Sequence, residues 1–117
     1  MGLFSRNDKK SAIKEGGRHL KISTTKEGSE YTFLLDGRLD TVTAPNLDSK
    51  INEAVGDATK LVFDLSKLEY ISSAGLRVLL GATQAMKNKG EMVVRNVSQS
   101  VREVFDLTGF SRLFTIE

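Results

Sequence analysis

Residues 64–76 have the sequence Asp-Leu-Ser-Lys-Leu-Glu-Tyr-Ile-Ser-Ser-Ala-Gly-Leu, which joins a strand pattern to a helix pattern. It begins inside an apolar run at 61–65, which is typical of a central strand covered on both faces. It ends in a pattern of apolar residues at helical spacing, which predicts a helix over 73–89. Between the two we expect a loop that brings Ser72 and Ser73 to the first turn of the helix.

Strand and helix patterns alternate on both sides of this stretch. Strands are predicted at 20–24, 31–35, 61–65, 92–94 and 113–116. Besides the helix over 73–89, one helix is predicted from a Thr43 cap to Gly56, and another from a capping box at 100–103 to Gly109. The first two strands are expected to form a hairpin, and strands that alternate with helices imply right-handed crossovers and parallel neighbours. The prediction is an α/β fold with a mixed central sheet of about five strands and three main helices packed against it.

The length and charge distribution indicate one domain with a basic leader. A chain of 117 residues buries a single core. Five basic and two acidic side chains lie in residues 1–18, so a net charge of +2 leaves the remainder slightly acidic. We therefore expect a flexible basic tail at 1–18 and one folded domain at 19–117. A nucleic-acid binder concentrates positive charge on a folded face, so no direct nucleic-acid contact is expected.

The composition favours a cytoplasmic protein. The chain contains no cysteine, which excludes disulfides and thiolate ligands and is typical of a reducing compartment. No apolar run approaches the roughly 18 residues that a membrane-spanning helix needs, and the N-terminal residues lack the apolar core of a signal peptide. No membrane insertion is expected.

The usual enzyme constellations are missing from the sequence. His19 is the only histidine, and it lies at the boundary of the basic tail. No metal site, bound cofactor or catalytic residue is therefore predicted, because no ligands cluster around it and no glycine-rich phosphate loop is present. A serine hydrolase elbow would need glycine two residues before its nucleophile, where Ser73 has Ile71 and Ser72 has Tyr70.

The serine pair has one plain structural interpretation. Serine caps helices well, because its side-chain oxygen accepts a hydrogen bond from a free N–H of the first turn. Only one of the two serines is needed for this role.

An ordered set of short motifs surrounds the serine pair. Asp-Leu-Ser at 64–66 precedes Ser-Ser-Ala-Gly-Leu-Arg-Val-Leu-Leu at 72–80, with Gly-Arg-Leu-Asp at 37–40, Thr-Ala-Pro at 43–45 and Leu-Thr-Gly-Phe at 107–110. This set resembles the STAS domain, which sulphate-transporter tails share with bacterial anti-sigma factor antagonists. The resemblance covers residues 20–117 and implies the STAS fold.

The resemblance also implies a phosphorylation site. The family's usual string is Asp-Ser-Ser/Ala-Gly, and its first serine is phosphorylated by a partner kinase. Matching on Gly75 places that serine at Ser73, with Ala74 after it. Ser72 stands where the family has aspartate, so it is the alternative site. Asp40 matches a family aspartate that takes part in kinase recognition.

These residues form a predicted partner-binding set. Arg77 joins it because it follows Ser73 by four residues on the same helical side, where a guanidinium can pair with a phosphate or remain solvated. The full set is Asp40, Ser72, Ser73, Ala74, Gly75 and Arg77.

The resemblance implies an anti-sigma factor antagonist that is a substrate and binding module, not an enzyme. Its unmodified form would bind an anti-sigma factor serine kinase and so release a sigma factor. Serine phosphorylation would end this binding, and a metal-dependent serine phosphatase would restore it. An accessory or scaffold subunit of a transporter ATPase or of a sensor complex is the alternative, because one fold serves several functions.

Overall fold

The computed structural model describes residues 20–117. The predicted tail at 1–18 and His19 lie outside the described residues. Five strands form one sheet in the order β1-β2-β3-β4-β5. Their bounds are β1 Leu20–Glu27, β2 Glu30–Leu39, β3 Lys60–Ile71, β4 Glu91–Arg95 and β5 Thr115–Ile116. The helices are α1 Ala44–Ala54, α2 Ser73–Met86 and α3 Gln99–Thr108, and a short 3-10 turn follows at Phe110–Arg112.

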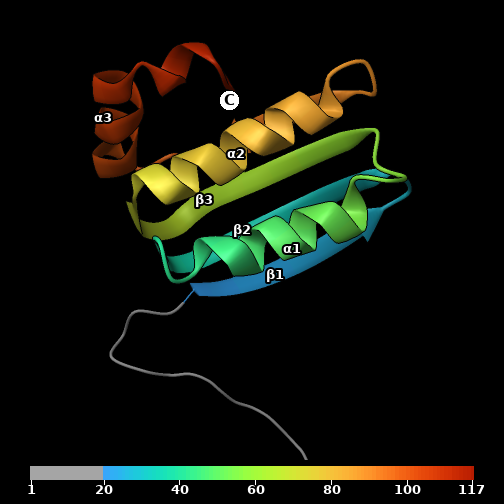
Figure 1. The fold of residues 1–117 in the computed structure, drawn as a ribbon, viewed down its shortest axis with the longest axis horizontal. Helices are drawn as coiled ribbons and strands as arrows, with labels where there is room; N and C mark the ends of the chain where they lie inside the picture. The colour runs from blue at the N-terminus through green and yellow to red at the C-terminus, as the bar shows by residue number, and fades with distance from the viewer. Residues whose placement is uncertain (1–19) are drawn as a thin grey trace, which may run out of the picture.

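The sheet is mixed, as the sequence predicts. β1 pairs antiparallel with β2 as a hairpin, and β2, β3, β4 and β5 are parallel neighbours. Figure 1 shows α1 and α2 lying side by side across one face of the sheet, with α3 beside the end at which α2 begins. The predicted α/β fold with three helices on a five-stranded mixed sheet is confirmed. Among residues 20–117, no helix is long and apolar enough to cross a membrane.

The core lies between the sheet and the helices. Phe33, Phe63 and Phe105 are among the largest fully buried side chains. The Phe33 and Phe63 rings stack across β2 and β3 with centroids 5.3 Å apart. Phe105 brings α3 into the same cluster and meets Phe114 edge to face. Because β3 has buried residues from Leu61 to Ile71, it anchors both α3 and α2, and α2 begins at the serine pair.

β3 is longer than predicted and contains two irregularities. Its pairing with β2 shifts register between Leu34 and Asp36 and again between Gly37 and Arg38. The predicted loop after Leu65 is therefore wrong, because the strand continues to Ile71. Extra residues in one strand, accommodated as bulges, keep the ladder going and re-aim side chains. Ser66, Lys67 and Glu69 are polar and exposed, which made this part resemble a loop in sequence.

One predicted helix cap is wrong, and the other is right in its position. The α3 cap is Ser98, whose hydroxyl accepts a hydrogen bond from Val101 N at 3.3 Å, whereas Ser100 lies inside the helix. Thr43 is the N-cap of α1, as predicted, but its side chain makes no cap bond. Its hydroxyl accepts from Asp40 N at 2.9 Å and donates to Arg38 O at 2.8 Å. Thr43 therefore stabilises the turn before α1 instead of the helix end itself.

Candidate functional site

The serine pair lies where β3 passes directly into α2. Ser72 has an extended backbone conformation and is the N-cap, and its hydroxyl accepts a hydrogen bond from Gly75 N at 3.4 Å. Its own N–H donates to Leu39 O at 2.9 Å, which ties the start of α2 to the end of β2. Ser72 thus fills the capping role that the sequence assigns to one of the two serines.

Ser73 is the first residue of α2, and its side chain is exposed. Within residues 20–117 its hydroxyl makes no hydrogen bond. Ser73 therefore has no capping task, and its oxygen is accessible at the positive end of the α2 dipole. Ala74 beside it is half-buried.

Gly75 is a packing residue under this surface. It is buried, and a Cβ at this position would lie 2.6 Å from Leu39 Cγ and 3.0 Å from Ile71 Cγ1. Only glycine lets α2 approach the end of β2 this closely. Gly75 therefore positions the serines without presenting a side chain to a partner.

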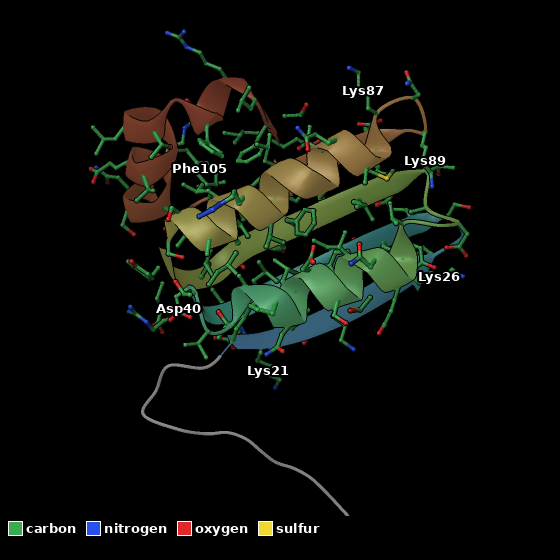
Figure 2. The ribbon with its side chains drawn as sticks, viewed as in Figure 1. Lys21, Lys26, Asp40, Lys87, Lys89 and Phe105 are labelled. Carbon is green, nitrogen blue, oxygen red and sulfur yellow. The ribbon has the colours of Figure 1, made fainter. Side chains whose placement is uncertain are left out.

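Asp40 lies in the turn between β2 and α1, directly after the residue that accepts the Ser72 N–H. Figure 2 shows it at the end of the molecule where α1 and α2 begin. Asp40 is buried, and its Oδ1 accepts hydrogen bonds from Val42 N at 3.0 Å and Thr43 N at 3.1 Å. These bonds make Asp40 a structural element of the turn, close to the serine pair.

Arg77 follows Ser73 by one helical turn and is exposed. It makes no ion pair within the part of the chain that the structure describes. The predicted pairing of Arg77 with a phosphate on Ser73 remains a prediction.

Sequence reasoning missed three residues at this edge. The Arg38 guanidinium lies over the Tyr70 ring, with its central carbon 4.2 Å from the ring centroid. Its Nε lies 3.8 Å from Asp40 Oδ2. Val42 is 65% exposed and Tyr70 is 41% exposed. An exposed cation–aromatic pair contributes about 0.5–1 kcal/mol and fixes the orientation of the arginine.

The whole arrangement matches one family model. The model of the STAS domain matches residues 21–117. The chain belongs to the STAS domain family. Its sequence is 35% identical to BtrV of Bordetella bronchiseptica over 99 residues, which are 83% of this chain and 85% of that protein. It is 30% identical to RsfB of Mycobacterium tuberculosis over 83 residues, covering 70% and 68% of the two chains. BtrV is named as an anti-sigma factor antagonist, and RsfB as an anti-sigma-F factor antagonist.

A solved STAS structure has the same fold. It is the crystal structure of an anti-sigma factor antagonist from Mycobacterium paratuberculosis, with a TM-score of 0.76 and 26% sequence identity. The similarity covers 83% of this chain and 84% of that one.

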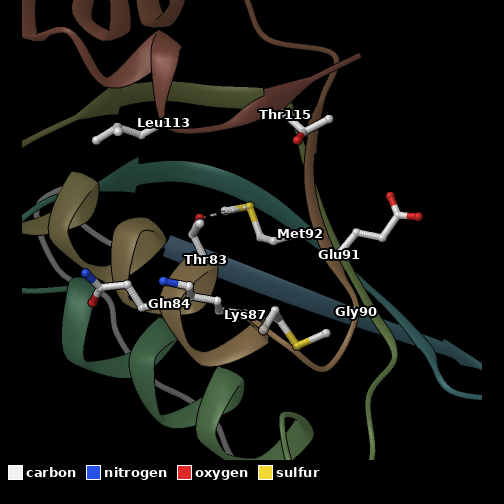
Figure 3. A pocket seen from close by; sticks show the side chains of 9 residues that line it. Thr83, Gln84, Lys87, Gly90, Glu91, Met92, Leu113 and Thr115 are labelled. Carbon is white, nitrogen blue, oxygen red and sulfur yellow. Dashed lines mark hydrogen bonds between the residues drawn. The ribbon is translucent and has the colours of Figure 1, made fainter.

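A pocket lies at the other end of α2 in this STAS domain (Figure 3). It has a volume of about 330 Å³ and is lined by Thr83, Gln84 and Met86 of α2, by Lys87 directly after the helix, and by Met92, Leu113 and Thr115, among others. At about 1.5 Å rise per residue, the length of α2 separates it from Ser73 by roughly 20 Å. Within residues 20–117 no acidic, histidine or cysteine cluster could hold a metal ion.

Proposed function

We propose that this STAS domain is an anti-sigma factor antagonist whose Ser73 is switched by phosphorylation. The observation that carries the proposal is the division of roles between the two serines. Ser72 caps α2, whereas the Ser73 hydroxyl is exposed and makes no hydrogen bond within residues 20–117. A kinase can therefore reach Ser73 without breaking the cap. The names of the two relatives support the same role.

The partner would be an anti-sigma factor serine kinase that meets this chain in the bacterial cytoplasm. In the unmodified state the edge around Ser73 binds the kinase, which then releases its sigma factor. The Ser73 oxygen later attacks the γ-phosphorus of ATP held by the kinase, the bond to ADP breaks, and the hydroxyl proton passes to the kinase or to water. This chain is the substrate of that transfer. A metal-dependent serine phosphatase hydrolyses the phosphoserine and restores the binding state.

The modification is expected to change the surface and leave the fold intact. A phosphate adds about −1.5 to −2 charges. At the first position of α2 it meets free N–H groups and the positive end of the helix dipole, which favours it by about 0.3–1 kcal/mol. The same charge would repel acidic groups of a bound kinase. Phosphorylation therefore weakens the complex while the domain stays folded.

The test begins by identifying the kinase and mapping the phosphate. The Ser73→Ala variant, used as bait in extract of the source bacterium, is expected to retain an ATP-binding anti-sigma kinase. Incubation of the wild-type chain with this kinase and ATP should place phosphate on Ser73, as read by mass spectrometry. Phosphate on Ser72 would transfer the switch to the capping residue, and phosphate on neither serine would contradict the proposal.

Affinity measurements complete the test. In calorimetric titrations with the kinase, Ser73→Ala should bind as strongly as the unmodified chain, and Ser73→Asp should bind at least tenfold more weakly. Arg77→Gln tests the predicted phosphate contact, because its loss should lower the thermal stability of the phosphorylated form only. Equal affinities of the Ala and Asp variants would refute the charge mechanism.

A further inference from the structure

Arg38 and Tyr70 form a surface pair at the edge that carries the serines. The two residues are directly opposite each other in the parallel pairing of β2 and β3. Ser72 follows Tyr70 by two residues, and its N–H donates to the carbonyl of Leu39, the neighbour of Arg38. The arginine and the serine pair are therefore placed on adjacent strand ends by the backbone itself.

The Arg38 side chain is held from two sides. The Tyr70 ring supports its guanidinium at 4.2 Å, and Asp40 Oδ2 lies 3.8 Å from its Nε. Asp40 is in turn fixed by the N–H groups of Val42 and Thr43. An arginine held in this way loses little further conformational freedom when it binds a partner.

The Arg38 side chain is partly exposed and has donors that are not used inside the domain. The side chain is 37% exposed, and its terminal amino groups make no hydrogen bond within residues 20–117. A guanidinium presents parallel N–H donors that match the two oxygens of a carboxylate. Tyr70, under the guanidinium, and Val42, whose N–H donates to Asp40, add exposed apolar surface. Such a patch is complementary to an acidic side chain that is flanked by apolar ones.

We infer that Arg38 is a specificity-determining residue of this switch and binds a carboxylate of the anti-sigma kinase. The inference rests on the proposed function and names the chemistry of the partner surface. It also explains why a phosphate on Ser73 is an effective off signal. The new dianion appears at the edge to which the kinase brings its own negative charge, so the two repel each other and the phosphate competes for the same cation.

The experiment compares two arginines, Arg38 at the serine edge and one outside the predicted partner-binding set. Arg38→Gln removes the charge while retaining a polar side chain, and Arg112→Gln is the control, because Arg112 is an exposed arginine of the 3-10 turn. In titrations of the unphosphorylated variants against the purified anti-sigma kinase, Arg38→Gln should raise Kd about tenfold, and Arg112→Gln by less than threefold. Arg38→Lys should lie between wild type and Arg38→Gln, because lysine keeps the charge but lacks the planar fork.

Charge reversal and salt dependence give independent measurements. Arg38→Glu should weaken binding further than Arg38→Gln, and the affinity difference between wild type and Arg38→Gln should shrink as salt rises from about 50 to 300 mM. Urea unfolding checks that each variant is folded. If Arg38→Glu does not fold, the conclusion rests on Arg38→Gln alone. Wild-type affinity of folded Arg38→Gln, or equal losses in both arginine variants, would overturn this inference alone. A kinase that fails to bind the wild-type chain would overturn the proposed function as well.

Discussion

The N-terminal end of α2 begins beside a polar turn, whereas its C-terminal end runs into a turn that packs against backbone. At the N-terminal end, Ser72 caps the helix and Ser73 remains exposed. At the C-terminal end, the N–H groups of Lys89 and Gly90 both donate to Met86 O, at 2.9 and 3.0 Å. Glu91 N then donates to Thr59 O at 3.2 Å. One end has an exposed serine hydroxyl, and the other is closed by backbone contacts.

The charged side chains at the two ends of the sheet differ in burial and in their hydrogen bonds to the backbone. Near the Ser73 edge, Asp40 is buried and fixed by backbone N–H groups. At the opposite end, Lys26 lies 3.5 Å from Asp57, and the hydrogen bond from Tyr31 is the main cause that holds the pKa of Asp57 below its ordinary value. Exposed ion pairs of this kind contribute little to stability. At the edge that carries Ser73, a buried polar side chain is therefore part of the fold. At the opposite end, the ion pair lies on the surface and stabilises the fold little.

The largest expected effect tests the closed end. A Cβ at Gly90 would lie 1.8 Å from Thr59 O, a backbone atom that cannot rotate away. Gly90→Ala should therefore lower the free energy of unfolding by about 3 kcal/mol, measured by urea denaturation. Gly81→Ala is the matched control on α2, since nothing lies within 4 Å of its Cβ position. The free energy of unfolding of Gly81→Ala should rise by about 0.5–1 kcal/mol, because alanine has the higher helix propensity. Similar stabilities of the two variants would show that Gly90 is not needed for the close contact with Thr59.

The second effect tests the switch end with the same control. At Gly75 a Cβ would meet side-chain atoms of Leu39 and Ile71, at 2.6 and 3.0 Å, and side chains can yield more than backbone. Gly75→Ala should cost about 2 kcal/mol, less than Gly90→Ala. Because the displaced atoms hold the start of α2 against β2, kinase affinity should also fall, which Gly90→Ala should not cause in its folded fraction. If Gly75→Ala lost stability but kept its affinity for the kinase, Gly75 would not be needed to position the kinase-binding edge.

The two serines provide the third and sharpest comparison. Ser72→Ala removes the cap of α2 and should cost about 1 kcal/mol in urea denaturation. Ser73→Ala removes an exposed hydroxyl and should change stability by less than about 0.5 kcal/mol. Phosphorylation should show the reverse pattern, with Ser72→Ala still accepting phosphate and Ser73→Ala refusing it. If only Ser73→Ala lost stability, Ser73 would be the cap of α2 and Ser72 the candidate phosphorylation site.

The arrangement of elements was predictable from sequence because it depends on local patterns. Apolar periodicity locates all five strands and three helices, and the right-handed crossover rule gives their parallel neighbours. The motif around Gly75 likewise leads to the serine pair. Boundaries were harder, because the polar residues of 66–69 resemble a loop, and only pairing with β2 keeps them in a strand.

The Arg38 and Tyr70 contact could not be predicted because it depends on a register. The two residues are 32 positions apart, and both register shifts in β3 are needed to bring them opposite each other. A one-residue change in pairing moves side chains to the other face, so spacing alone does not identify such a pair. The exposure of Val42 also results from the turn that Asp40 and Thr43 build.

The smallest expected effect concerns the bulge that directs β3 toward the switch end. Asp64 Oδ1 accepts a hydrogen bond from Ser66 N at 3.0 Å, where the register first shifts. Burial alone would raise the pKa of Asp64, but the hydrogen bonds of Ser66 and Asn96 and the charge of Arg95 together hold it below its ordinary value. Since the folded state then binds fewer protons near pH 4 than the unfolded state, the carboxylate stabilises the domain above about pH 4, and this contribution is lost as pH falls below that value.

Asp64→Asn should therefore be slightly less stable than wild type at pH 7, and the two urea midpoints should converge as pH falls from about 5 to 3. Asp48→Asn is the control, because Asp48 is an exposed carboxylate on α1 with no ion pair in the described part of the chain. Its midpoint should follow that of wild type at every pH. If the difference in urea midpoint between Asp64→Asn and wild type stays unchanged at pH 3, the charge of Asp64 does not stabilise the bulge. The shape of the side chain then accounts for the whole effect.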